Sequence, residues 1–458
     1  MSEPGITLND KRAPLSSKFG YAMGGLGCVF GQIIPIFLTF FMTESLAIPI
    51  VTASLMIMLV KIIDAVSDII AGFIIDKTKS PKGKARPWFL RMAIPYALCL
   101  ALIYFVPAEM GMAGKVALVA ILYALCVSIF GTMLNVARYA LIPRMSKHPA
   151  DRGAFSALGD GMVCIVVGLL CAVNMIMVGM IGWKMTYTIF AIVAAIGCLI
   201  CFALCKELPR EVIDGAIEQQ RANSSFKGLL KSLFTNKYAL CLLIYVLGCA
   251  TTSGFLQAGG TYFWTYYMGN MAGFSLSMAI MVPIGFVTMF IMPFVMRKTT
   301  RMFGFASVVG GIVLIILSMI AAPNTFAPTI VVMLFAHVPV MQLAMMTYGQ
   351  MSALTVDYGE WKSGIRSDGV TSSVVNIGLK IGAAIGAAAS GFILGAAGFQ
   401  AGGVAQTAEA VMAVKNIYTL IPGILSLIIG VVFLITWRMP KYLPTIKADL
   451  AKRHAAEQ

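Results

Sequence analysis

The stretch KIIDAVSDII places three ionisable side chains, Lys61, Asp64 and Asp68, inside an apolar run that extends from Val51 to Ile75. Their spacing of i, i+3 and i+7 puts all three on one stripe of an α-helix. Two carboxylates one turn apart repel each other unless a positive group neutralises them. A bound Na⁺, a proton, or the lysines Lys61 and Lys380 would each neutralise this pair.

A charged side chain at the centre of a membrane-spanning helix costs about 2.5–3.5 kcal/mol on insertion scales, so such residues face a bundle interior and are usually functional. A static ion pair between two helices is the alternative interpretation. An ion pair needs one acid for one base, whereas this stripe carries an additional acid. The pattern therefore favours a site for a mobile cation.

The elements that must position these residues are membrane-spanning helices. Of 458 residues, 59% are hydrophobic and only 12% are charged, and the mean hydropathy is +0.88. Average soluble domains carry about 25% charged residues, which excludes that class. Because about 20 apolar residues cross a ~30 Å hydrocarbon core, we predict an all-α membrane protein with twelve spans. These lie near 19–43, 50–75, 92–108, 116–138, 154–182, 185–205, 238–268, 272–296, 303–322, 326–353, 369–396 and 416–437.

The net charge of +15 predicts the topology of the chain. If the N-terminus is on the cytoplasmic side, the only Lys or Arg residues in the outer loops are Lys115, Lys184 and Lys415. Nearly all other cationic residues lie on the cytoplasmic side. This asymmetry follows the positive-inside rule and places both termini in the cytoplasm. It explains the basic composition without nucleic acid. The polar N-terminal stretch MSEPGITLNDKRAPLSSK precedes the first span and predicts no cleavable signal peptide.

One long polar segment, KELPREVIDGAIEQQRANSSFKGLLKSLFTNK, divides the spans into six and six. That arrangement is typical of transporters built from two bundles, whose substrate site lies near the bilayer midplane. We predict four parts: an N-terminal six-helix bundle at 1–205 with the cation site, a cytoplasmic middle loop at 206–237, a C-terminal six-helix bundle at 238–438, and a cytoplasmic tail at 439–458.

All ten cysteines fall inside predicted helices. Cys198, Cys201 and Cys205 have a spacing of i, i+3 and i+7, but no His or carboxylate accompanies them within the span. Free cysteine packs as a small hydrophobe, so we interpret these residues as packing. The sequence also shows no nucleophile–base pair and no phosphate-cradling motif, which argues against an enzyme, and we expect no cofactor.

Three motifs carry a resemblance to a known family. The first is D-A-V-S-D-(x)3-G-F-I-I-D-K-T-(x)4-G-K-A-R-P-W from Asp64, the second is VDYGEWKSGIRSDGVTSSVVNIGLK at 356–380, and the third is YFWTYYMG at 262–269. They resemble motifs of the glycoside–pentoside–hexuronide:cation symporters, the melibiose-permease-like branch of the major facilitator superfamily. Together with the length of the chain and its number of predicted spans, these motifs extend the resemblance over nearly the whole chain. It implies the major facilitator fold.

The resemblance also implies which residues bind the coupling ion, Na⁺ or H⁺. Asp64 and Asp68 match the two acidic residues of the family's cation site, and both would be Na⁺ ligands in a sodium-coupled protein. Ser67 occupies the place of an Asn ligand, and Thr132 matches a hydroxyl ligand on the fourth span. Lys380 matches the lysine between the cation and sugar sites, and Lys61 stands where a known member of the family has Arg. These two lysines are the expected coupling residues.

The sugar site departs further from the family pattern. Where a known member of the family has an Asp on the first span, this chain has Cys28. The positions of that member's sugar-binding Asp, Trp and Arg hold Asn135, Tyr139 and Asp160. Asn and Tyr can still hydrogen-bond a sugar and stack on it. Arg138 and Asp160 either contact substrate or pair with each other. The candidate substrate residues are Cys28, Asn135, Tyr139, Asp160, Arg138 and Lys380.

The loops between spans contribute a further set of charges near the two long motifs. We interpret them as an inward gate, because weak charge pairs can bias a near-balanced conformational equilibrium. The gate residues are Asp76, Lys77, Arg86, Asp357, Glu360 and Arg366.

The resemblance implies a secondary active symporter that couples inward Na⁺ or H⁺ flux to uptake of a sugar or glycoside by alternating access. The alternative is a cation-coupled transporter of a non-sugar solute, including an anion held by Lys61, Arg138 and Lys380. The expected partners are a small-molecule substrate and the lipid bilayer. We expect a monomer that spans a bacterial plasma membrane several times.

Overall fold

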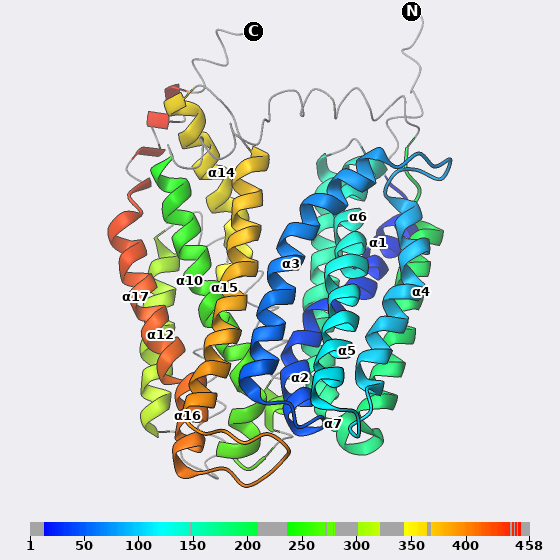
Figure 1. Ribbon diagram of the computed structural model, residues 1–458. Helices are drawn as coiled ribbons and strands as arrows, with labels where there is room; N and C mark the ends of the chain where they lie inside the picture. Colours follow the sequence, from blue (N-terminus) through cyan, green and yellow to red (C-terminus); the bar gives the residue numbers. More distant parts are fainter. Residues whose placement is uncertain are drawn as a thin grey trace, which may run out of the picture. The chain divides into compact units, whose positions relative to one another are not determined.

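A computed structural model gives the fold of the chain, and all regular secondary structure in its described residues is helical (Figure 1). It describes residues 13–146, 149–208, 236–270, 273–277, 279, 301–320, 343–363, 368–439, 442–443, 445–446 and 448–449. The contacts divide the chain into two compact units. The first comprises Met1–Ile48 and Leu59–Ala222, and the second comprises Pro49–Met58 and Asn223–Gln458.

The helices of the first unit include two local irregularities. Helices α1 and α2 are separated at Val29, six residues before Pro35, whose ring leaves the carbonyl four residues earlier without its helical partner. A π-helical segment, η2, joins α5 to α6. The elements are α1 Leu15–Cys28, α2 Phe30–Glu44, α3 Ile50–Lys77, α4 Arg86–Leu102, η1 Ile103–Phe105, α5 Met112–Ala124, η2 Leu125–Gly131, α6 Thr132–Met145 and α7 Pro149–Leu204. The residues of α3 up to Met58 belong to the second unit.

The second unit begins with a capped helix. The Asn236 side chain accepts hydrogen bonds from the backbone N–H groups of Tyr238 and Ala239 at 3.1 and 3.2 Å, which satisfies two donors of the first turn of α10. Another π-helical segment, η3, ends this span. The elements are α10 Lys237–Tyr262, η3 Phe263–Tyr267, α12 Met302–Ile320, α14 Leu343–Ser363, α15 Asp368–Ala396, α16 Ala408–Tyr418 and α17 Leu420–Thr436.

Eight helices within the described residues are long and apolar enough to cross a membrane. The longest, Ala154–Leu204, has 51 residues and would extend about 76 Å at 1.5 Å per residue, more than twice the hydrocarbon thickness. It is divided at Gly182, where φ is 76°, so that two helices meet there. This break falls at the junction of two predicted spans, 154–182 and 185–205. The predicted spans 272–296 and 326–353 lie mostly outside the described residues.

Helix α1 packs closely against the last part of α7. Gly20, Gly24 and Gly27 face α7, and a Cβ atom at any of them would collide with Leu204, Cys201 or Cys198. The Cα atom of Gly27 also faces Gly197 across the contact. Small residues of this kind let membrane helices approach closely. The spacing of Cys198, Cys201 and Cys205 therefore follows the glycine stripe of α1.

Aromatic side chains form the core at one end of the second unit. Tyr238 meets the Tyr358 ring edge-on at 4.6 Å and the Trp437 ring at 5.6 Å. The tail contributes to this core, because Ile446 is fully buried and Asp449 accepts a 2.9 Å hydrogen bond from Trp361 Nε1. Tyr358 and Trp361 belong to the VDYGEW motif, so this motif holds the tail against the unit.

Candidate functional site

Helix α3 continues without a break through the Lys61, Asp64 and Asp68 stripe. Its buried side includes Ile57, Val60, Ala71 and Ile75, whereas the opposite side exposes large apolar residues. Asp64 continues the buried stripe one turn after Val60. Lys61, Asp64 and Asp68 are each half-buried, so α3 presents them at the edge of its packed face.

Thr132 joins α3 to the fourth span through Asp64. Its hydroxyl donates to Asp64 Oδ1 at 2.7 Å, and the Thr132 side chain is buried. The Ser67 hydroxyl lies 2.8 Å from the Asp64 carbonyl oxygen and 3.3 Å from Thr132 Oγ1. The structure thus brings three of the four predicted cation ligands into one hydrogen-bonded cluster. The fourth, Asp68, lies one turn further along α3.

The π-helical segment η2 sets the position of Thr132, which directly follows it. Inside this segment, the buried Ser128 donates a 3.2 Å hydrogen bond to the Val60 carbonyl of α3. The Thr132 hydroxyl also lies 3.2 Å from the Val127 carbonyl. Single π-turns inside helices occur frequently at functional sites. Ser128 of this segment and Thr132, which follows it, therefore both form hydrogen bonds to α3.

A second polar cluster lies further along α6, around Arg138. The Arg138 side chain is 1% exposed, and its Nη2 atom pairs with Asp160 Oδ1 of α7 at 3.0 Å. Asp160 also accepts hydrogen bonds from Tyr139 at 3.3 Å and Ser156 at 3.2 Å. The predicted pairing of Arg138 with Asp160 is therefore present. The Arg138 guanidinium lies 4.3 Å from the Tyr139 ring centre and 5.9 Å from the Tyr21 ring centre.

Arg138 keeps unused hydrogen-bonding capacity. Its Nε and Nη1 atoms are buried and have no hydrogen-bond partner among the described residues. A guanidinium carries five N–H donors and is always charged, but both nitrogens are enclosed by protein, so an acceptor oxygen reaches them only when the packing around Arg138 opens.

The remaining predicted substrate residues lie in different surroundings. Cys28 is buried at the end of α1, next to the glycine stripe that faces α7. Asn135 is half-buried on α6, one turn after Thr132 and one turn before Arg138, and so lies between the two polar clusters along the helix. Tyr139 is exposed apart from its contacts with Arg138 and Asp160. Lys380 is half-buried on α15 in the second unit.

The predicted gate residues are distributed over both units. Lys77 lies over the Phe73 ring at 4.4 Å, and Arg86 donates from Nε to the Phe202 carbonyl at 2.7 Å. In the second unit Asp357 is half-buried and Glu360 is buried. The side chain of Asp76 and the whole of Arg366 lie outside the described residues.

Glu207 is a site-forming residue that the sequence analysis missed. Its carboxylate accepts hydrogen bonds from the backbone N–H groups of Lys84, Ala85 and Arg86 at 3.0, 2.8 and 2.6 Å. A carboxylate at this position stabilises the start of α4 through both hydrogen bonds and the helix dipole. An acid directly after a span, with a Gly-containing basic loop elsewhere in the same half, is the only sequence signal for this contact.

The described helices are long and apolar enough to cross a membrane, and a family comparison specifies the class of protein. The model of the MFS/sugar transport protein family matches residues 20–440. The chain therefore belongs to this family, and the resemblance to the glycoside–pentoside–hexuronide:cation symporters is confirmed.

Curated relatives extend over nearly the whole chain. The isoprimeverose transporter of Lactiplantibacillus pentosus is 27% identical and aligns over 100% of this chain and 95% of its own. The glucuronide carrier protein homolog of Escherichia coli K12 is 26% identical and aligns over 99% of this chain and 96% of its own. A putative 2,3-dihydroxypropane-1-sulfonate exporter of the same organism is 25% identical over 91% of each chain.

Solved structures confirm the fold. The nucleoside transporter NupG aligns with a TM-score of 0.65 and 15% identity, over 93% of this chain and 98% of its own. The inward-open xylose transporter XylE from E. coli aligns with a TM-score of 0.61 and 12% identity, over 93% and 96%. The chain is therefore an all-helical transporter with the major facilitator fold.

Proposed function

We propose that this protein is a symporter that couples inward flux of Na⁺ or H⁺ to uptake of a sugar or glycoside. The hydrogen-bonded cluster of Asp64, Ser67 and Thr132 carries the proposal, with Asp68 one turn away. The relatives supply the substrate class, since one transports isoprimeverose. Twelve spans, cytoplasmic termini and a location in the bacterial plasma membrane remain part of this proposal.

The cluster supplies the oxygen chemistry that Na⁺ requires. A hydroxyl donates one hydrogen and keeps lone pairs, so Thr132 can donate to Asp64 and still offer its oxygen to a cation. Asp64 and Asp68 supply negative charge that a bound cation offsets. A proton taken up by either carboxylate would remove the same repulsion. Both ions therefore fit the residues.

Coupling between ion and sugar follows from the shared helices. Thr132, Asn135 and Tyr139 follow one another at i, i+3 and i+7 and lie on one face of α6. A cation that fixes Thr132 against Asp64 thus fixes the face that carries the candidate sugar residues. Transport then follows by alternating access, in which the site opens first to one side of the membrane and then to the other.

Uptake into proteoliposomes tests this proposal. We expect accumulation of a glycoside from a panel of glycosides and hexuronides when an inward Na⁺ or H⁺ gradient is applied. Asp68→Asn replaces one carboxylate with an uncharged amide of similar size. This variant is expected to abolish gradient-driven accumulation. Glu109→Gln, which changes an exposed loop carboxylate, is the matched control and should transport normally. Uptake that is independent of the ion gradient and unchanged in Asp68→Asn would refute the proposal.

The buried Arg138 favours a second candidate, a cation-coupled transporter of an organic anion. Its Nε and Nη1 atoms are unused among the described contacts, and a relative is a putative sulfonate exporter. A sulfonate or carboxylate could accept two parallel hydrogen bonds from such a guanidinium. Including 2,3-dihydroxypropane-1-sulfonate in the same panel separates the candidates. If the sulfonate is the only compound transported and Arg138→Lys abolishes its transport, the substrate is an organic anion and not a glycoside.

A further inference from the structure

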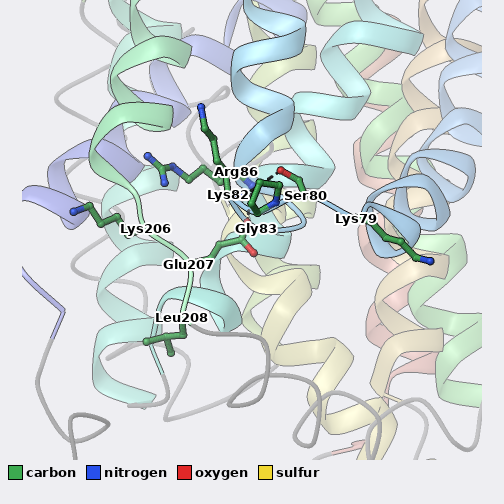
Figure 2. A pocket seen from close by; sticks show the side chains of 9 residues that line it. Lys79, Ser80, Lys82, Gly83, Arg86, Lys206, Glu207 and Leu208 are labelled. Atoms are coloured by element: carbon green, nitrogen blue, oxygen red, sulfur yellow. Dashed lines mark hydrogen bonds between the residues drawn. The ribbon is translucent and has the colours of Figure 1, made fainter.

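A hollow on the first unit is bordered by the loop after α3 and by the residues that follow α7 (Figure 2). Lys82, Arg86 and Lys206 line it, together with the carboxylate of Glu207. The positive-inside rule assigns this end of the helices to the cytoplasm.

Glu207 does not neutralise these cations, because its carboxylate is committed to the backbone. Side-chain exposure of Glu207 is 4%, and its oxygens accept the three N–H groups at the start of α4. Gly83 has a φ of 109° and lies so close that a Cβ atom would collide with the carboxylate. The nearest cation is Arg144, at 4.0 Å. Glu207 therefore shapes the hollow and leaves its rim positive.

The cations at the rim gather around one aromatic ring. The Arg86 guanidinium lies 4.7 Å and the Lys82 ammonium 5.3 Å from the centre of the Phe202 ring, in the last turn of α7. In Figure 2 the side chains of Lys82 and Arg86 extend to the same side as Lys206, whereas Lys79 points away. Within the described residues, no carboxylate lies within 4.0 Å of the charged nitrogens of Lys82, Arg86 or Lys206.

Below these cations, two adjacent helices present apolar ridges. On α4 the residues at four-residue intervals from Arg86 are Leu90, Ile94, Leu98 and Leu102, which are 42–60% exposed. On α7, which packs against α4, Ile189, Ile192, Ile196 and Leu199 are likewise exposed. From Leu90 to Leu102 the α4 ridge extends about 18 Å, slightly more than the roughly 15 Å of hydrocarbon in one leaflet. The surface thus joins three cations to an aliphatic strip of the length of acyl chains.

We propose that this surface binds an anionic phospholipid of the inner leaflet. The phosphodiester lies between Lys82, Arg86 and Lys206, and the acyl chains follow the exposed ridges of α4 and α7. The two cations over Phe202 lie at the ends of α4 and α7 that the positive-inside rule assigns to the cytoplasm, where lipid phosphates are expected. Basic pockets at the cytoplasmic ends of spans are known to bind anionic headgroups. The site is separate from the cation cluster at Asp64 and Thr132, so it stands independently of the proposed transport activity.

Binding of a short-chain lipid to the purified full-length protein tests the proposal. The probe is dioctanoylphosphatidylglycerol, and native mass spectrometry in neutral detergent measures its dissociation constant. Lys82→Gln combined with Lys206→Gln is expected to weaken binding roughly 25-fold, since each lysine near a membrane surface contributes about fivefold. The matched control is Lys184→Gln combined with Lys415→Gln. These lysines also lie over aromatic rings, Phe105 and Tyr267, and removing them changes the net charge equally. The control should bind within twofold of the unchanged protein.

Each other outcome overturns the proposal. Equal weakening in both double variants would mean that net charge alone attracts the lipid. Unchanged binding in Lys82→Gln/Lys206→Gln would exclude the site. Glycerol phosphate, tested in parallel, should bind at least tenfold more weakly than the lipid, and equal affinity would identify a soluble phosphate site instead. Thermal melting verifies that each variant is folded, and if the double variant is unfolded, Lys206→Gln alone should weaken binding about fivefold.

Discussion

At the scale of single residues, hydroxyl groups connect the helices of the candidate cation site. Thr132 donates to Asp64, and Ser128 donates to the Val60 carbonyl. Each hydroxyl is buried and bonds to α3, so each holds the fourth span in one register against the helix with the two carboxylates. The site therefore depends on side chains that carry no charge.

Substitution of Thr132 tests this dependence. Thr132→Ala removes the oxygen that lies 2.7 Å from Asp64, and Thr132→Ser keeps it. A hydrogen bond to a charged group contributes about 1.5–3 kcal/mol, so the alanine variant should need at least tenfold more Na⁺ or H⁺ for half-maximal uptake. Thr132→Ser should stay within about threefold. Thr188→Ala, at an exposed hydroxyl bonded to its own helix, is the control. Equal effects of alanine at 132 and 188 would contradict the assignment.

Asp151 is a charge whose effect on stability depends on pH. It accepts a 2.8 Å hydrogen bond from the Ala13 N–H and pairs with Lys18 at 2.9 Å. These two contacts lower the pKa of the Asp151 carboxyl below its ordinary value. A lowered pKa means that the stabilisation is fully present above the unfolded pKa, near 4, and is lost as the pH falls through the folded pKa.

We therefore expect Asp151→Asn to lower the stability at pH 7 by about 1.5–3 kcal/mol. The difference between Asp151→Asn and the unchanged protein should hold from pH 7 to about pH 5 and shrink below about pH 4. Melting temperatures in detergent across this range measure it. Glu109→Gln, at an exposed carboxylate, is the control. A difference in stability between the two proteins that grows as the pH falls would contradict this prediction.

At the scale of helices, close packing of small residues decides how the first unit is assembled. Gly27 of α1 and Gly197 of α7 approach so closely that a Cβ atom on either would meet the backbone of the other helix. Backbone cannot move aside as a flexible side chain can, and overpacking of this kind typically costs 1–3 kcal/mol.

Two glycines of α7 provide a matched comparison. Gly197→Ala should destabilise the protein by about 1–3 kcal/mol, because its new methyl group meets Gly27 and the Met23 carbonyl. Gly179→Ala should be neutral or stabilising by up to about 1 kcal/mol, since nothing lies within 4 Å of its Cβ position and alanine favours the helix. Melting temperatures of the two variants measure the contrast. Similar values would show that the α1–α7 contact does not limit stability.

At the scale of the whole molecule, the proposed function is a coupling free energy between two ligands. Binding of the ion at Asp64 and Asp68 must change the affinity for the sugar by some factor, and the sugar must change the affinity for the ion by the same factor. A transporter needs this factor to be large enough to favour joint movement, typically 5–150-fold.

Isothermal titration calorimetry checks this reciprocity. The sugar should bind at least fivefold more tightly at saturating Na⁺, or at the favoured pH, than without it. The ion titrated at saturating sugar should gain the same factor. In Asp68→Asn both factors should fall to about one while weak sugar binding persists. Loss of all sugar binding in that variant would instead place Asp68 in the sugar site.

The motifs and the family resemblance that they carry predicted the major facilitator fold and singled out Asp64, Ser67 and Thr132, which the structure shows in contact, while their role as cation ligands stays a prediction. The motif around Asp64 fixes a spacing along one helix, and Thr132 lies at a matching position of the family pattern. The contacts of Glu207 were not predictable, since they involve backbone N–H groups that any loop sequence carries. The π-helical segment LCVSIFG was not predictable either, because its apolar residues fit an ordinary helix equally well.

The π-helical segment at Leu125–Gly131 has a consequence for how this chain can vary. A π-turn holds one residue more than the α-turn that it replaces, so it acts as a one-residue insertion retained inside a continuous helix. If one residue is deleted there and the segment becomes α-helical, one residue fewer covers the same rotation, so Thr132 and all later positions of α6 keep their direction relative to α5. Loss of one codon in this short window would therefore leave the direction of Thr132, Asn135 and Arg138 unchanged, whereas the same loss in the regular helix α5 would rotate all three by about 100°.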